Sequence, residues 1–501
     1  MSEKSPIEYN ENSIEDFSIE KEVKEAVSTT GYYTYAEEAK LLRRVDLRIM
    51  PLLVLLYLCK NLDVNNISYI LTINKSEPGN VLAQLAMTKD EWAWTSTIYF
   101  IPFVIFEIPS TLLLKKTTPR IHQFRIAFLW GVVTACQSAV KNKQGLYALR
   151  FLLGFFEAGM FPGMLAHLVY WYRPDEASIR IAILGVLGSF SSVLSAFITY
   201  GFSFANGKGG LSGWQWVFLV EGIFSIVCSV GLYFWLPNFP NDSKWLSDQE
   251  KAYLIARLPP QAPKSSDKAF DIQGIIKSLL KPTTLLFVFL KFFQGVGTYG
   301  LSFWLPSIIQ SFGITSSTTS PLMTIPSSAA AVFSGIFFSY LVDLAWYSPA
   351  TLTSCSMIVS IGAFIVLAVV TNKAVLYAFI IIATVSTNAN GASVISWMAH
   401  TLEGSSQVGF NYAFTNAVAQ LGGIIGPQIY REKYAPRYVI SYIISLIFIA
   451  AGLVLNVALW WLTRNKMSEV IQDKKKRLKQ NKNDPNDKPV YNQEFENITD
   501  V

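Results

Sequence analysis

Five ionisable residues lie inside long apolar runs of this 501-residue chain. Lys60 and Asp63 lie one helical turn apart, while Arg150 and Glu157 lie two turns apart on one side of a helix. Lys291 lies eight residues into a third run. A charged side chain inside a bilayer is costly unless it is paired or hydrated, and such residues are therefore functional candidates by default.

The chemistry that these residues could perform is binding of an anion and of a proton. Two ammonium groups, on Lys60 and Lys291, attract an anion strongly if they face one another across a low-dielectric cavity. Glu157 lies deep in its run and is the first candidate for a proton-carrying group, with Asp63 as the second. Plainer interpretations stay open: Lys60 and Asp63 neutralise each other, each lysine has an acidic partner of its own, and Arg150 packs near an interface.

The elements that position these residues follow from the distribution of charge. Charged residues make up 15% of the chain and hydrophobic residues 51%. Three stretches, 1–48, 237–282 and 463–501, hold 46 of the 76 charged residues. The remaining sequence cannot cover a water-facing surface, which excludes a soluble enzyme, a disordered chain and a secreted disulfide scaffold. The sequence therefore predicts a polytopic membrane protein.

Apolar runs of the length that a bilayer requires occur twelve times, as six, a polar gap and six more. They cover 49–72, 92–114, 122–140, 147–171, 179–202, 214–236, 283–305, 321–342, 350–371, 374–398, 407–429 and 438–462. Two groups of six suggest an internal duplication. We therefore expect two six-helix bundles, 49–236 and 283–462, joined by a cytoplasmic linker, 237–282, that contains one or two surface helices.

The distribution of Lys and Arg between loops predicts the orientation. With both termini in the cytoplasm, 29 of these residues lie in inside segments and 9 in outside loops. No cleavable signal peptide opens the chain. The N-terminal tail, 1–48, and the C-terminal tail, 463–501, are expected to be disordered and cytoplasmic.

Further polar residues and missing motifs limit the function. Asn388 and Asn390, in the tenth run, are candidate hydrogen-bonding groups for a substrate. The chain contains no GxxxxGK[ST] phosphate-binding loop, so ATP-driven pumping is not indicated. Its three histidines are isolated and have no cysteine partners at metal-binding spacing, so we expect no metal site. The polar segments are too short for a catalytic domain, and we expect no enzymatic activity.

Several motifs together resemble one known family. The segment RFLLGFFEAGMFPGMLAHLVYWY, 150–172, closely resembles the fourth-helix signature of the fungal allantoate permease family, an anion:cation symporter branch of the major facilitator superfamily. Other matching segments within 40–465 are NLD at 61–63, EIPSTLLLKK at 107–116, GWQWVFLVEG at 213–222, LPNFPND at 236–242, FWLPSII at 303–309 and GGIIGPQIYREKYAPRY at 422–438.

The resemblance implies an all-α membrane protein with twelve transmembrane helices, arranged as six plus six around a central cavity. It also implies proton-coupled uptake of small organic anions, because family members carry allantoate, nicotinate, pantothenate and related compounds. In organic-anion transporters of the same superfamily, a cation on helix one, an Arg and a Glu on helix four and a cation on helix seven take part in anion binding and proton coupling. Lys60, Arg150, Glu157 and Lys291 fall at matching places.

These expectations define one hypothesis and two alternatives. The protein is predicted to be a monomeric plasma-membrane symporter that uses a proton gradient, with no cofactor and no nucleic-acid partner. Its partners are the lipid bilayer, protons and a small anion. A drug-exporting antiporter is less favoured, since the segment 185–197 of the fifth run lacks the Gly-Pro element of that branch. A nutrient sensor that signals through its tails is also less favoured, because both tails are short.

Overall fold

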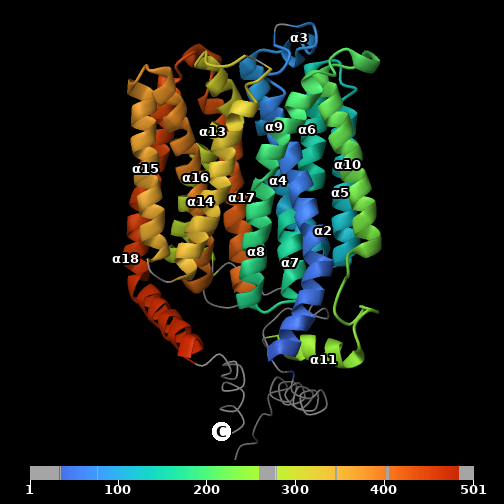
Figure 1. The fold of residues 1–501 in the computed structure, drawn as a ribbon, viewed down its shortest axis with the longest axis vertical. Helices are drawn as coiled ribbons and strands as arrows, with labels where there is room; N and C mark the ends of the chain where they lie inside the picture. Colours follow the sequence, from blue (N-terminus) through green and yellow to red (C-terminus); the bar gives the residue numbers. More distant parts are fainter. Residues whose placement is uncertain are drawn as a thin grey trace, which may run out of the picture.

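The computed structural model of the protein is a bundle of long helices (Figure 1). It describes residues 33, 35–75, 77–114, 116–258, 277, 279–316, 318–344, 347–401 and 405–483. The short helix α3, Val81–Gln84, lies at one end of the bundle, and α11, Asp248–Ala256, lies at the other (Figure 1). We call these the α3 end and the α11 end.

The N-terminal half contains six spans, two of which are broken into pairs of helices. Its long elements are α2 (Tyr35–Tyr69), α4 (Lys89–Leu114), α5 (Pro119–Gln137), α6 (Lys143–Glu157), α7 (Met160–Val169), α8 (Pro174–Ser189), α9 (Ser191–Ser203) and α10 (Gly213–Trp235). The pairs α6–α7 and α8–α9 each follow one predicted run. The short 3-10 helix η1, Lys208–Gly210, precedes α10.

The C-terminal half contains six further long helices. They are α13 (Pro282–Ser311), α14 (Ile325–Asp343), α15 (Pro349–Val369), α16 (Lys373–Thr401), α17 (Ser405–Ile429) and α18 (Val439–Asn483). The 3-10 helices η2, Leu322–Thr324, and η3, Glu432–Tyr434, lie in its connections.

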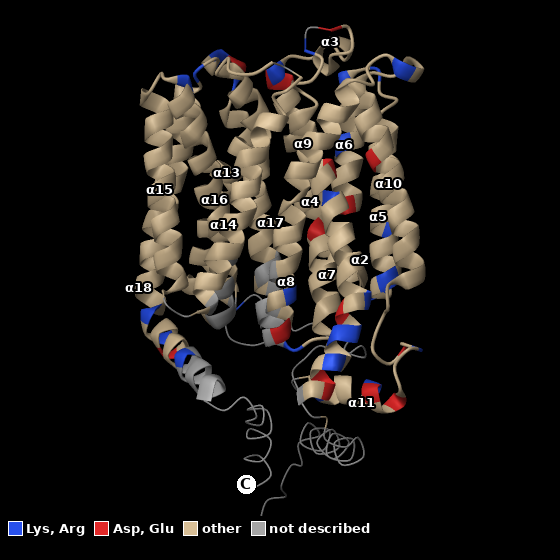
Figure 2. Ribbon diagram, in the orientation of Figure 1, with Lys and Arg blue, Asp and Glu red and all other residues tan. Residues whose placement is uncertain are grey.

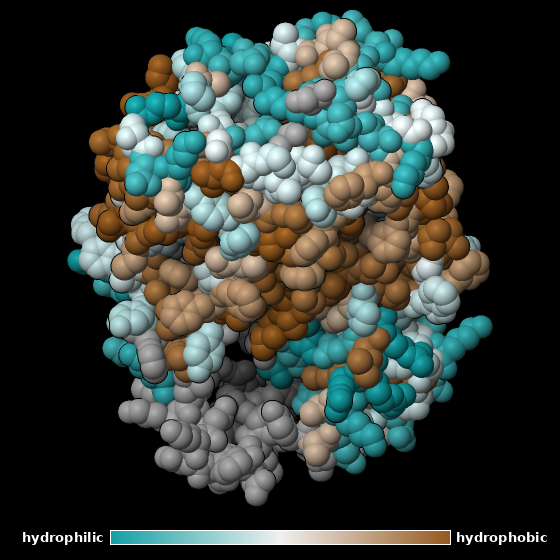
Figure 3. All heavy atoms as spheres, turned by 45° about the horizontal axis from the view of Figure 1, so that its top comes forward, coloured by the Kyte–Doolittle hydropathy of each residue, from teal (hydrophilic) through white to brown (hydrophobic). Residues whose placement is uncertain are grey.

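The helical composition of the bundle is that of a membrane domain. Within the described residues, nine spans are long and apolar enough to cross a membrane. Helices α2, α5 and α17 are not among the nine but run beside them (Figure 1). Large apolar side chains such as those of Val227, Phe234 and Phe333 point outward and are more than 60% exposed. Figure 3 shows the result, a hydrophobic belt between more hydrophilic ends. The predicted twelve-helix, all-α fold is confirmed.

Two helices extend further than the sequence predicts. Residues 35–48 form the first turns of α2, and residues 463–483 continue α18, although both segments were expected to belong to disordered tails. Tertiary packing explains the first difference, because Leu41 and Val45 are buried against the N-terminal half. Apart from residue 33, the rest of the predicted N-terminal tail lies outside the described residues, and so do residues 484–501.

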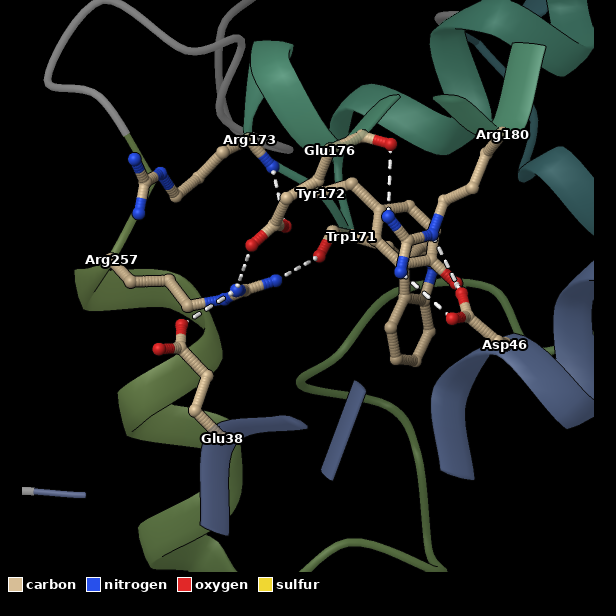
Figure 4. Close-up of polar contacts among 8 residues, drawn as sticks. All are labelled: Glu38, Asp46, Trp171, Tyr172, Arg173, Glu176, Arg180 and Arg257. Carbon is tan, nitrogen blue, oxygen red and sulfur yellow. Dashed lines mark hydrogen bonds and ion pairs between the residues drawn. The ribbon is translucent and has the colours of Figure 1, made fainter. Parts of the chain in front are cut away.

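Helix α11 lies in the predicted linker and is fastened to the N-terminal half by a buried arginine (Figure 4). Arg257 Nη1 contacts Glu38 at 3.1 Å and Glu176 at 2.8 Å. Its Nη2 donates to the carbonyl oxygen of Trp171 at 3.0 Å. The linker helix is therefore joined to the start of α2 and to the start of α8 at once. Residues 259–276 and 278 of the linker lie outside the described residues.

Candidate functional site

Four of the predicted site residues meet in the interior of the N-terminal half. Lys60 and Asp63 on α2 and Arg150 and Glu157 on α6 are all buried, with 9% or less of each residue exposed. The ammonium nitrogen of Lys60 lies 3.7 Å from Glu157 Oε1. Lys60 therefore forms its ion pair across two helices, with Glu157, whereas the simplest reading of the sequence pairs it with Asp63.

A break in the fourth span places the Glu157 carboxylate. Glu157 is the last residue of α6, and Gly159 has a φ of +83°, a left-handed conformation that favours glycine. A Cβ atom at Gly159 would lie 2.5 Å from Ser110 Oγ on α4, so a side chain does not fit there either. A proline, Pro162, follows within the span, but the break occurs before it. The Glu157 carboxylate therefore lies at the end of α6 and in the middle of the membrane span that α6 and α7 form together.

The other members of the group are held by neutral neighbours. The hydroxyl group of Thr134 on α5 donates to Asp63 Oδ2 at 3.3 Å. The Arg150 guanidinium lies over the ring of Phe218 on α10, at 5.4 Å from its centroid. The Lys60 ammonium lies 5.6 Å from the ring centroid of Phe103 on α4. Aromatic faces attract cations, so both rings stabilise the buried positive charges.

Glu107 and Glu221 are two buried carboxylates that the sequence reasoning did not include in the site. Glu107 on α4 is 1% exposed, and its Oε1 accepts a hydrogen bond of 3.1 Å from Asn416 on α17, which joins the two halves. Glu221 on α10 is 4% exposed. Both lie inside predicted apolar runs, 92–114 and 214–236, and this position was the signal that could have identified them.

The remaining predicted residues lie apart from this group. Lys291 is half-buried on α13, and no described residue forms an ion pair with it. Asn388 donates to the carbonyl oxygen of Thr384 at 2.8 Å, and Asn390 contacts Ser356 on α15. Both amides are thus engaged within the C-terminal half. Among the described residues no contact joins Lys291 to Lys60, so the expectation that the two lysines face one another across a cavity stays a prediction.

The two halves differ in the charge that they bury. In the described parts of α13–α17, apart from the terminal residues Asp343 of α14 and Lys373 of α16, the one charged side chain is that of Lys291. In Figure 2 the charged residues inside the bundle gather among the N-terminal helices, while the middle of the C-terminal helices is almost entirely uncharged. The described parts of α13–α17 thus contain a single half-buried cation, Lys291, whereas the N-terminal half contains the group of charges around Lys60 and Glu157.

The halves contact one another along α4 and α17. The hydroxyl groups of Ser96 and Thr97 donate to the carbonyl oxygens of Gly423 and Ile424, at 3.2 and 3.0 Å. At the α3 end, Lys89 on α4 forms an ion pair of 3.2 Å with Glu432 in η3. Within the described residues no group of three or more His, Cys, Asp and Glu side chains is arranged to hold a metal ion.

Comparison with known proteins identifies the family. The model of the Major Facilitator Superfamily matches residues 53–427. The chain belongs to the major facilitator superfamily. An uncharacterized transporter of Schizosaccharomyces pombe is 28% identical over 438 residues, which is 87% of this chain and 86% of the relative. A putative tartrate transporter of Agrobacterium vitis is 29% identical over 78% of this chain and 88% of its own length.

Other comparisons agree with this assignment. The transporter prlL of a fungal species is 30% identical to this superfamily member, over 84% of this chain and 86% of the relative. The fold also resembles a solved bacterial homologue of the human lysosomal transporter Spinster, in an inward-facing and unoccupied conformation. That likeness has a TM-score of 0.62 at 15% identity and covers 84% of this chain and 97% of the other. The protein is therefore a multi-pass membrane transporter of the superfamily.

Proposed function

We propose that this transporter is a proton-coupled symporter that takes up a small organic anion. The observation that carries the proposal is the buried ion pair between Lys60 and Glu157, at 3.7 Å. The Glu157 side chain has no exposed surface, whereas that of Lys60 keeps 11%. The Lys60 ammonium group therefore contacts a fully buried carboxylate, that of Glu157, and remains partly accessible to solvent.

This arrangement couples a proton to an anion by competition for one cation. While Glu157 is ionised, its charge satisfies Lys60. When Glu157 binds a proton, Lys60 loses its partner and becomes available to the carboxylate of a substrate. Because a buried cation without a partner is costly, proton binding and anion binding favour each other. Movement of the two halves about the site then exposes both ligands to the other side of the membrane.

The C-terminal half is proposed to supply the second contact. Lys291 is the one charged residue in the described α13–α17 other than the helix-terminal Asp343 and Lys373, and no described side chain forms an ion pair with it. Asn388 and Asn390 are proposed to donate hydrogen bonds to the same anion once the halves close on it. Arg150 contributes positive charge behind Glu157, and Asp63 remains the second proton-carrying candidate.

The substrate class rests on this charge and on the relatives. A relative with the name of a putative tartrate transporter supports a small carboxylate. Allantoate, nicotinate and pantothenate remain candidates from the motif resemblance. We further propose that the protein functions as a monomer in the plasma membrane, with both termini in the cytoplasm, and that it needs no cofactor besides the proton gradient.

Uptake measurements test the proposal directly. Wild-type protein in proteoliposomes is expected to accumulate one of four labelled anions (allantoate, nicotinate, pantothenate or tartrate) when the outside is acidified. Glu157→Gln is expected to abolish the dependence of uptake on the pH gradient, because the amide cannot exchange a proton. Lys291→Ala is expected to raise KM for the anion at least tenfold.

Two exposed residues provide matched controls. Asp242→Asn removes a carboxylate and Lys208→Ala removes an ammonium group, both at exposed positions away from the site. Neither control is expected to change uptake. If Glu157→Gln and Lys291→Ala both left pH-dependent uptake intact, the proposed function would be wrong.

A further inference from the structure

The N-terminal half buries more negative than positive charge. Among the described residues, its buried charged side chains inside the membrane helices are two cations and four carboxylates: Lys60, Arg150, Asp63, Glu107, Glu157 and Glu221. The Lys60–Glu157 pair accounts for one of each. A buried carboxylate without a counter-charge is costly and becomes neutral by taking up a proton. The imbalance therefore indicates proton binding beyond Glu157.

Glu221 is the carboxylate that best fits this excess charge. It lies on α10 and is 4% exposed, and neither of its oxygens has a hydrogen-bond partner among the described residues. The next residue, Gly222, lies against the backbone of α5, where an added Cβ would be 2.3 Å from the amide nitrogen of Ala135. This close helix contact fixes the Glu221 backbone inside the bundle.

Arg150 connects Glu221 to Asp63. Its guanidinium lies over Phe218, which precedes Glu221 by one turn of α10. The charges of Asp63 and Glu221 both act on Arg150. Arg150 is 2% exposed, and its Nε and Nη2 atoms have no partner among the described residues. One guanidinium from α6 thus interacts with two carboxylates, one on α2 and one on α10, and two of its nitrogen donors, Nε and Nη2, have no described partner.

Few other titratable groups face this cluster. Helix α5 contributes the neutral side chains of Thr134 and Trp130. The described residues of α9, which also packs on α10, include no charged side chain. Cys59 on α2 is near both acids, and Tyr99 on α4 and Glu157 on α6 both act on Arg150. No other described neighbour therefore adds a positive charge to that of Arg150, which faces the two acids Asp63 and Glu221.

We propose that Glu221 is a further proton-binding residue of this transporter, sharing Arg150 with Asp63 in a site inside the N-terminal bundle that adjoins the Lys60–Glu157 pair. This inference rests on the proposed proton coupling. One carboxyl group of the two holds a proton while Arg150 pairs with the other. A proton that leaves Glu221 passes to Asp63, and Arg150 then pairs with the Glu221 carboxylate. The substrate anion needs no contact with this site.

The test separates substrate exchange from proton-driven accumulation. In proteoliposomes, the anion with the highest uptake among the four above is measured in exchange, without a pH gradient, and in accumulation driven by one. Glu221→Gln is expected to keep exchange within about twofold and to lower accumulation at least tenfold, because binding survives while proton carriage is lost. Glu221→Asp retains a carboxyl group and is expected to recover part of the accumulation.

A neighbouring buried serine serves as the matched control. Ser225 lies one turn beyond Glu221 on α10 and is also buried. Ser225→Ala is expected to leave exchange and accumulation unchanged. A loss in Ser225→Ala equal to that in Glu221→Gln would show that any change at this helix contact disturbs the bundle, and would overturn the assignment.

The outcomes distinguish this inference from the proposed function. If Glu221→Gln accumulates anion as the wild type does while Glu157→Gln does not, Glu221 carries no proton and the proposed symport stands. If the wild type shows no accumulation under a pH gradient, the proposed symport itself fails.

Infrared spectroscopy decides the case in which Glu221→Gln does not fold. The wild type and Glu157→Gln are both expected to show, at neutral pH, the carbonyl band of a protonated carboxyl group. Its presence in Glu157→Gln assigns the proton outside the Lys60–Glu157 pair. Its absence from Glu157→Gln would overturn the inference.

Discussion

Removal of the Arg257 side chain is expected to release α11 from the N-terminal half. Arg257 is 2% exposed and contacts Glu38 at 3.1 Å and Glu176 at 2.8 Å. Removing one partner of a buried ion pair typically costs about 3–5 kcal/mol, because the remaining charges lose their counter-ion. Both carboxylates keep some exposure, 17% and 15%, so Arg257→Ala falls at the lower limit, about 3 kcal/mol.

Hydrogen exchange of α11 measures this free energy. At about 1.4 kcal/mol for each factor of ten, 3 kcal/mol corresponds to a roughly 100-fold increase in the open state. The backbone amides of residues 248–256, followed by mass spectrometry in lipid nanodiscs, are therefore expected to exchange about 100-fold faster in Arg257→Ala. The same measurement on Arg257→Lys, which keeps the charge but loses the guanidinium fork, is expected to give an intermediate rate.

A second arginine between the same two helices provides the control. Arg44 on α2 forms an ion pair of 2.6 Å with Glu250 on α11, but its side chain is 46% exposed. Exposed pairs contribute about 1 kcal/mol or less, so Arg44→Ala is expected to raise exchange by about fivefold at most. Equal exchange in the two variants, or unchanged exchange in Arg257→Ala, would refute the reasoning and would leave apolar packing as the cause of docking.

Three further predictions concern packing, pH and the contact between the halves. A Cβ atom in Gly154→Ala would lie 2.0 Å from a backbone oxygen of α4, so thermal unfolding in detergent should show a loss of about 1–3 kcal/mol, whereas Gly185→Ala, with nothing within 4 Å, should show none. Although partial burial raises the pKa of Glu250, hydrogen bonds from the Ser247 backbone and from Arg44 outweigh this effect and hold it below the ordinary 4.5. Its stabilisation of α11 is thus present above pH 4.5 and lost as pH falls through the lowered pKa, a dependence that exchange measurements should find weakened in Glu250→Gln. The Lys89–Glu432 pair is partly exposed, so reversing Lys89 to Glu should change transport rates less than about fivefold at low salt and still less at high salt, and a larger change that persists at high salt would contradict this estimate.

Much of the fold could be predicted from the sequence because the bilayer acts on each segment separately. A membrane span must be long and apolar wherever it lies, so runs such as 92–114 and 350–371 can be recognised as spans without knowledge of the helices that pack against them. The same rule makes an ionisable residue inside a run conspicuous, which is why Lys60 and Glu157 could be selected. Breaks within a span are harder to predict from the sequence, since the break at Gly159 depends on the close approach of α4.

The partners of the selected residues could not be predicted in the same way. Spacing along one helix suggests that Lys60 pairs with Asp63, but the structure pairs Lys60 with Glu157, ninety-seven positions away. Glu221 was part of a recognisable motif, yet its significance depends on Arg150 from another helix. Such contacts depend on how helices pack, and no local pattern encodes that.

The sequence alone therefore determined that this protein is a twelve-helix membrane transporter with a few charged residues in its interior, where burying a charge is energetically costly. This follows because the energy of placing a residue in lipid is a property of the segment that carries it. Only the tertiary structure decided which charges interact, with Lys60 paired with Glu157 and with Arg150 under the influence of both Asp63 and Glu221. Electrostatic energy in a low-dielectric interior depends on distances between helices, and these distances exist only once the bundle has packed.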